Sequence, residues 1–163
     1  MKIDVRHSLP CSVERFWQLY WDDGFDEQLR RHTAVKRELL SETWDGKIRV
    51  RRVRFSPQRE LPAPIAAILG AQRLAYEQEN RFDQARNEMR WTVLPSLLPG
   101  RLTASGRFRI EEDGDDSCVL RIDGDIIVAI PFVGGQVEKA IVTEIERSYS
   151  KLADTVRTAL TEG

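Results

Sequence analysis

The chain has few of the residues that build metal centres, disulfide frameworks and histidine-based sites. Its 163 residues include only two cysteines and two histidines. Cys11 and Cys118 have no metal-binding or redox spacing, so we expect free thiols in a reducing, cytoplasmic setting. The histidines cluster with no carboxylates or thiolates, and no cofactor motif is present. We therefore expect neither a metal site nor a cofactor.

The chain also lacks a strong charge and a long apolar run. A net charge of -1 provides no overall field toward nucleic acid or an anionic membrane. The longest apolar runs fall far short of the ~20 residues that span a bilayer, so at most transient membrane contact is expected. The first residues alternate charged and apolar, which is typical of a strand and not of a signal peptide.

What the sequence does contain is a regular succession of periodic segments within one domain, residues 1–163. An alternation of period two predicts strands, and helical spacing predicts two short helices at 13–20 and 25–31 and a long one at 136–159. The proline-rich segment 56–71 is expected to be a loop with one helical turn. The predicted strands are 2–9, 35–44, 47–55, 72–82, 88–94, 102–112 and 118–129.

This order predicts an α+β helix-grip fold. A curved antiparallel sheet of about six to seven strands would wrap around the C-terminal helix, with two short helices after the first strand. An antiparallel sheet with one apolar face needs a cover, and only the last helix, at about 36 Å, is long enough to provide it.

Three segments resemble a known superfamily, namely "ELPAPIAAILGA", "ASGRFRI" and "IPFVGGQVEKAIVTEI". With the element order, they are similar to the START-like (SRPBCC) superfamily of the major birch-pollen allergen and the polyketide cyclases. Within it they look like an uncharacterised bacterial branch, a domain of unknown function. The resemblance implies a cavity between sheet and helix that binds lipids or other apolar ligands. It carries over no catalytic residue.

The junction before the last helix contains two adjacent glycines, Gly134 and Gly135. We interpret them as a tight strand-to-helix reversal, because no phosphate-loop pattern is present and Glu138 would repel an anion. If Gly135 has a positive φ, Gly135→Val should lower stability by about 1 kcal/mol or more.

Candidate cavity-lining residues follow from the apolar phase of the strands and of the last helix. Two polar candidates have alternatives. His7 is a headgroup anchor or general base, or a satisfied core histidine. Arg52 faces the cavity with Arg54 and binds an acidic headgroup, or a bulge near Arg51-Arg52 resets the faces, or the side chain is simply exposed to solvent. The predicted lining residues are His7, Arg52, Tyr76, Trp91, Phe108, Ile126, Ile141 and Tyr149.

Two loops, at 61–69 and 94–98, are unusually apolar for connecting segments. They either pack on the body or form a portal through which a poorly soluble ligand enters. The predicted portal residues are Leu61, Ile65, Leu69 and Leu97.

The function that these patterns favour is binding, and possible transport, of a hydrophobic or amphipathic small molecule such as a lipid, quinone or polyketide-like compound. The alternatives are a cyclase- or dehydratase-type enzyme on a similar ligand, and a partner-binding domain without a ligand. A solid interior would favour the last. We expect a monomer or weak homodimer.

The parity of the last two predicted strands generates a first testable prediction. If segment 118–129 pairs with 103–111, then Leu120, Ile122, Ile126 and Val128 share the buried face. Ile126→Asp should then lower the free energy of unfolding by several kcal/mol, because burying an unpaired carboxylate is unfavourable. Thermal unfolding measures this cost, and an unchanged melting temperature would contradict the register.

Overall fold

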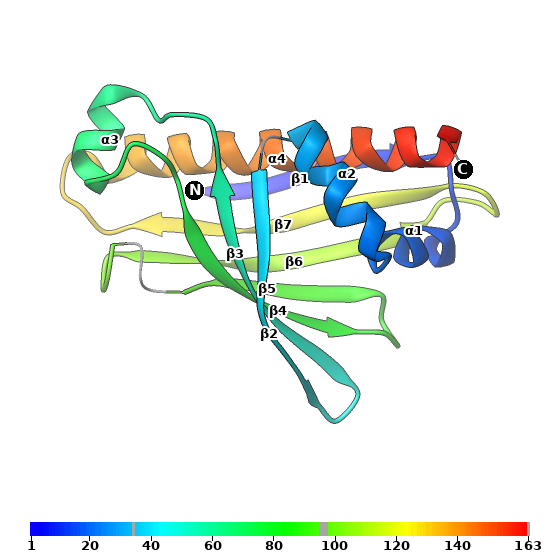
Figure 1. Ribbon diagram of the computed structural model, residues 1–163. Coiled ribbons are helices and arrows are strands. Elements are labelled where there is room, and N and C mark those ends of the chain that lie inside the picture. Colours follow the sequence, from blue (N-terminus) through cyan, green and yellow to red (C-terminus); the bar gives the residue numbers. More distant parts are fainter. Residues whose placement is uncertain (34, 95–97, 163) are drawn as a thin grey trace.

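The computed structural model describes residues 1–33, 35–94 and 98–162. Its element order is β1 (Lys2–Leu9), α1 (Val13–Tyr20), α2 (Asp23–Thr33), β2 (Val35–Asp45), β3 (Ile48–Pro57), α3 (Ala63–Leu69), β4 (Tyr76–Asp83), β5 (Glu88–Val93), β6 (Leu102–Glu112), β7 (Cys118–Val128) and α4 (Gly134–Glu162) (Figure 1). The helix-grip prediction is confirmed: a seven-stranded antiparallel sheet packs against a long C-terminal helix. Segment 56–71 contains a full helix, α3, in place of the single turn expected.

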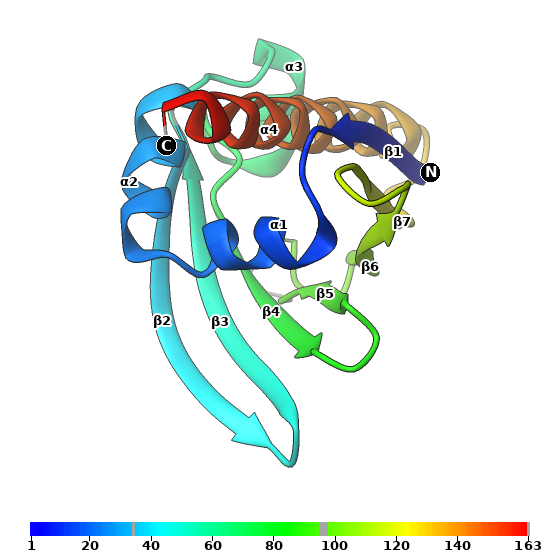
Figure 2. The same ribbon diagram turned by 90° about the vertical axis from the view of Figure 1, so that its right-hand side faces the viewer.

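The sheet has the order β1-β7-β6-β5-β4-β3-β2, so the first two strands of the chain form opposite edges. The segment with α1 and α2 connects these edges. In Figure 2 the sheet curls, α4 lies across its concave side, and α1 and α2 lie toward the C-terminal end of α4. Figure 1 shows α3 near the other end of that helix. None of the helices described is long and apolar enough to cross a membrane.

The core lies between α4 and the concave face of the sheet. Thr103 pairs with Ile127 and Glu111 with Val119, so the predicted register of β6 and β7 is confirmed. Ile126 is fully buried. The stripe of α4 that meets this face is fully or partly buried along its whole length; it consists of Val137, Ile141, Ile145, Tyr149, Leu152, Val156 and Leu160.

The arginine-rich strand β3 has no bulge near Arg51-Arg52, and Arg52 and Arg54 are exposed to solvent, which was one of the alternatives that the sequence left open. Its alternation is regular, and the register shift lies in β2, between Leu39 and Ser41. Arg49 and Arg51 share the inner face with buried Val53, since Arg49 pairs with buried Phe82 of β4. The sequence pattern suggested Arg52 and Arg54 as the inward-facing candidates, because it did not show that Arg49 and Arg51 share one face with Val53 and Phe55.

Trp21 is the aromatic residue over which those inner arginines lie. The guanidinium carbons of Arg49 and Arg51 are 4.2 Å and 4.6 Å from its ring centroid. Glu42 of β2 accepts hydrogen bonds from both, at 3.0 Å and 2.9 Å. Two charges are therefore accommodated on an inner face by a shared carboxylate and a cation–π platform.

At the junction between β7 and α4, the tight position is Gly134 and not Gly135. A Cβ on Gly134 would overlap the carbonyl oxygen of Val128, whereas a Cβ on Gly135 would meet nothing within 4 Å. Phe132, with φ 68°, provides the reversal, so the expectation of a positive φ at Gly135 is wrong. Glu138 closes the junction by accepting a hydrogen bond from the Val128 N–H at 2.8 Å.

These two neighbouring glycines give a matched pair of substitutions. Gly134→Ala should lower the free energy of unfolding by about 1–3 kcal/mol, because the methyl group forces the start of α4 away from β7. Gly135→Ala should leave it unchanged or raise it by up to about 1 kcal/mol, through higher helix propensity. Urea unfolding of both variants measures the difference, and equal effects would contradict the close approach at Gly134.

Candidate functional site

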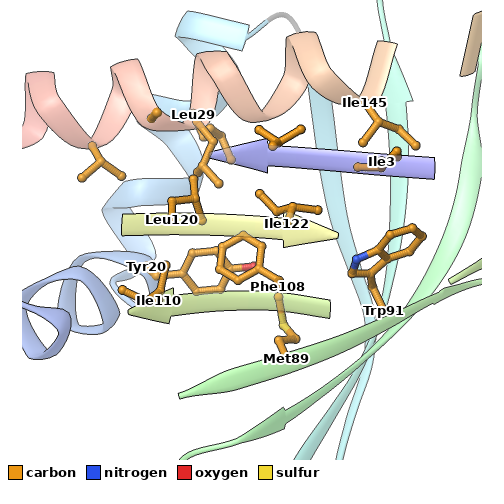
Figure 3. Close-up of a cluster of buried hydrophobic side chains, with 14 of the residues drawn as sticks. Ile3, Tyr20, Leu29, Met89, Trp91, Phe108, Ile110, Leu120, Ile122 and Ile145 are labelled. Atoms are coloured by element: carbon orange, nitrogen blue, oxygen red, sulfur yellow. The ribbon is translucent and has the colours of Figure 1, made fainter. Parts of the chain in front are cut away.

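A cavity of about 70 Å³ lies between the middle of α4, the α1–α2 segment and the inner face of the sheet from β2 to β6. It is partly open to the surface. Figure 3 shows Tyr20, Leu29, Met89, Phe108 and Ile145 converging from different elements. The lining consists of Tyr20, Leu29, Val35, Arg37, Phe55, Pro57, Leu74, Tyr76, Gln78, Asn80, Met89, Phe108, Glu144, Ile145, Ser148, Tyr149 and Leu152.

Aromatic rings form one wall of this cavity. Phe108 of β6 is 1% exposed, and its ring centroid lies 5.8 Å from that of Tyr20 and 5.9 Å from that of Tyr149. A second pair of rings also lines the cavity: Tyr76 of β4 stacks on Phe55 of β3, with 5.3 Å between the ring centroids. Rings at these separations pack favourably, so this wall is rigid and apolar with hydroxyl groups at a few points.

The polar part of the lining comes from neighbouring positions on β2 and β4. Phe55 of β3 pairs with Arg37 on one side and with Tyr76 on the other, so these three side chains form a row across the sheet. Gln78 and Asn80 follow Tyr76 at spacing two, and both are 5% exposed. The Gln78 amide nitrogen donates to the Asn80 side-chain oxygen at 2.6 Å.

Burial sets the protonation of the tyrosines. Burial raises the pKa of the Tyr76 hydroxyl far above its ordinary value. For Tyr149, burial again raises the pKa, with the nearby hydroxyls of Tyr76 and Tyr20 adding to it and Arg37 opposing it. Both phenols therefore stay neutral around physiological pH and act as hydrogen-bonding groups, not as bases.

Arg37 is the one cation among the cavity-lining residues described. Its guanidinium carbon lies 5.3 Å from the Tyr20 ring centroid, and Nη2 is 3.1 Å from Oδ1 of Asp26 on α2. Burial works to lower the pKa of Arg37, but Tyr20 and Asp26 outweigh it and the pKa is raised. The guanidinium is thus permanently charged. Its Nε is buried and has no hydrogen-bond partner.

Helix α4 contributes Glu144 and Ser148 to the opposite wall. Glu144 accepts a hydrogen bond from Arg147 at 2.7 Å, and its carboxylate is 3.7 Å from Nε of Arg59. These two surface arginines offset its charge. The cavity therefore combines a mostly apolar lining with one charged donor and a few amide and hydroxyl groups, which is a usual composition of a small-molecule site.

Three of the lining residues that the sequence predicted, Tyr76, Phe108 and Tyr149, line this cavity together. Ile126 and Ile141 are buried outside it. Both residues lie on an apolar face, as predicted, but they pack against other core side chains and do not border the cavity.

Trp91 is also buried outside the cavity, and it packs on two facing glycines of β6 and β7. A Cβ on Gly106 or Gly124 would approach its Cζ2 atom to within 2.6 Å or 2.7 Å. Its ring therefore occupies space that side chains on those two strands would need.

The two polar candidates lie elsewhere. His7 of β1 is partly buried next to Arg157 and Asp154 of α4 and does not line the cavity. The Arg52 side chain is 52% exposed and lies 3.8 Å from Glu77 on the outer face of the sheet. Its parity is opposite to that of Val53, which turns it toward solvent.

Three of the predicted portal residues, Leu61, Ile65 and Leu69, do not line the cavity described. Leu61 and Ile65 are buried, and Leu69 packs against the core. Leu97 lies outside the described residues. The segment around α3 thus packs on the body of the protein, and whether it opens for a ligand stays a prediction.

Sequence reasoning missed Arg37, Gln78 and Asn80. A signal was present, since Arg37 has the parity of Val35, and Gln78 and Asn80 have that of Tyr76 and Phe82. This signal is weak, because polar residues in such positions are more often exposed than buried.

The comparisons with known proteins bear on the fold. The fold is that of the START/SRPBCC proteins. A START superfamily protein from Mycobacterium smegmatis is 18% identical, with a TM-score of 0.65 over 97% of this chain and 98% of that one. The Zhui aromatase/cyclase from Streptomyces sp. R1128 is 14% identical, with a TM-score of 0.63 over 98% and 92%.

Norcoclaurine synthase from Thalictrum flavum, in complex with dopamine and hydroxybenzaldehyde, is 19% identical with a TM-score of 0.63, over 99% of this chain and 87% of that one. Residues 4–160 match the family described as "Protein of unknown function (DUF2505)", and the chain belongs to this family. No curated protein matches the sequence.

The environment of His7 gives a prediction about pH. Burial, and then Arg157, lower the pKa of His7 below its ordinary value of 6.5, against the effect of Asp154. The unfolded chain therefore takes up this proton first as the pH falls, so the stabilisation present above about 6.5 is lost below it. Unfolding free energies measured between about pH 7 and pH 5 should fall less steeply for His7→Gln than for the wild type.

The exposed histidine on α2, His32, serves as the control for removing a histidine as such. A His7→Gln profile that runs parallel to the wild-type profile would contradict the effect of burial at this position.

Proposed function

We propose that this protein binds a small molecule with a largely apolar body in the cavity between α4 and the sheet. The observation that carries the proposal is the cavity itself, in which aliphatic and aromatic side chains surround a few polar groups. Close-packed interiors leave few voids larger than a water molecule, because voids forfeit contacts, so a space lined in this way favours a ligand.

The volume limits what the cavity takes in this conformation. A space of about 70 Å³ corresponds to about two water molecules at ~30 Å³ each, and small-molecule sites typically measure ~300–1,000 Å³. A headgroup or the edge of a ring fits as it stands. A longer ligand extends through the open side or displaces flexible lining residues such as Met89.

The structural relatives support a small molecule as the occupant. One of them is an aromatase/cyclase, and another was solved with dopamine and hydroxybenzaldehyde. Those activities belong to those proteins. What supports the proposal here is the fold they share with this chain, which places a long helix over a concave sheet and leaves space beneath it.

Binding can be tested with a neutral, environment-sensitive dye such as Nile red. The folded protein should bind it at one equivalent with a blue shift in emission, and organic extraction followed by mass spectrometry should recover a co-purified compound. Ser148→Phe should weaken dye binding at least about tenfold, because the ring occupies the space below α4.

Thr143, exposed on the same helix and outside the cavity, is the matched control. Thr143→Phe should bind the dye like the wild type, and circular dichroism should show both variants folded. Dye binding that is absent from the wild type, or unaffected by Ser148→Phe, would exclude the cavity as the binding site.

A further inference from the structure

We propose that the ligand is a monocarboxylic acid with an apolar body, and that Arg37 holds its carboxylate. This inference rests on the proposed function and specifies the class of ligand. The observation behind it is a charged side chain that lines the cavity while one of its donors has no acceptor. Such a donor is costly to bury unless a partner arrives.

The guanidinium of Arg37 is only partly satisfied by the protein. Its side chain is 12% exposed, and its ion pair with Asp26 joins Nη2 to Oδ1 at 3.1 Å. The Nε–H remains buried and without a hydrogen-bond partner. A carboxylate suits this arrangement, because its oxygens accept from guanidinium N–H groups in short, charge-assisted hydrogen bonds.

The charges around the cavity favour an anion over a cation. The side chain of Asp26 is 50% exposed, so water screens its compensation of Arg37. Glu144, the one carboxylate among the described lining residues, is engaged by Arg147 at 2.7 Å and faced by Arg59 at 3.7 Å. The positive charge of Arg37 is therefore the least compensated charge that a ligand meets.

The polar groups next to Arg37 also favour an anionic ligand. Because the Asn80 side-chain oxygen accepts from Gln78, the Asn80 amide nitrogen is left as the donor on this face of the sheet. Burial keeps the hydroxyl of Tyr76 protonated, so it can donate as well. Phe55, Met89 and Phe108 then provide an apolar surface for the rest of the ligand.

Other inner-face arginines show an Nε that has an acceptor. Arg49 and Arg51 share Glu42 and lie on the Trp21 ring, and neither lines this cavity. Arg37 lies over Tyr20 in a similar way and interacts with the Tyr20 and Asp26 side chains, but its Nε has no acceptor. The carboxylate of a ligand would take the place that Glu42 has in the neighbouring cluster.

The test compares octanoic acid, octan-1-ol and octylamine as competitors of Nile red near neutral pH, where the acid is ionised. The three share one apolar chain and differ only in headgroup. We expect the acid to displace the dye at a concentration at least about tenfold lower than the alcohol, and the amine to be weakest.

Two substitutions should move this preference in opposite directions. Arg37→Gln should weaken the acid at least about tenfold while dye and alcohol change little. Asp26→Asn should strengthen the acid several-fold, because it removes the competing carboxylate. Arg52→Gln, an arginine on the outer face of the sheet, is the matched control and should leave the preference unchanged.

The outcomes separate the two proposals. If the dye binds but acid and alcohol compete equally, or Arg37→Gln keeps the preference for the acid, the carboxylate assignment is overturned and the binding function stands. If neither dye nor competitor binds, the binding function fails and the assignment fails with it. Should Arg37→Gln not fold, the wild-type series and the exposed Asp26→Asn site decide the matter.

Discussion

The structure depends on the packing of one helix stripe against a sheet wider than the helix. A helix with its side chains is ~10–12 Å across, whereas seven strands at ~4.8 Å separations extend about 30 Å. The sheet therefore curls, and α1 and α2 cover what α4 leaves open. Gly134 sets this packing at one end, since its lack of a side chain lets α4 start directly against the carbonyl of Val128.

Coverage by a single helix explains where polar side chains enter the interior. Beneath α4 the inner faces of β1, β6 and β7 are almost wholly apolar, with Leu120, Ile122 and Ile126 fully buried. Farther along the curl, on β2 to β4, the inner face carries Arg37, Gln78 and Asn80. Buried charges persist only when they are paired, and Arg37 differs from the arginines of β3 because its pairing is incomplete.

Much of the fold could be predicted because its signals are local. The strands, the two short helices, the helix at the end and the register of β6 on β7 followed from periods of two and 3.6 residues. The errors have local causes too. Val53 and Phe55 share a face with Arg49 and Arg51, so the sequence of β3 shows no clear alternation of apolar and charged residues. The reversal before α4 is at Phe132, a residue type that rarely takes a positive φ.

The sequence by itself determined the fold class, the faces of the strands and the buried stripe of α4, since each depends on backbone periodicity and apolar burial. Only the tertiary structure decided which inner-face residues border a space and which are packed solid. Parity assigns a side chain to a face, but the distance from that face to α4 depends on the curl of the whole sheet. For that reason Tyr76 and Arg37 meet the cavity, while Trp91 and Ile126, of equally apolar phase, lie in the core.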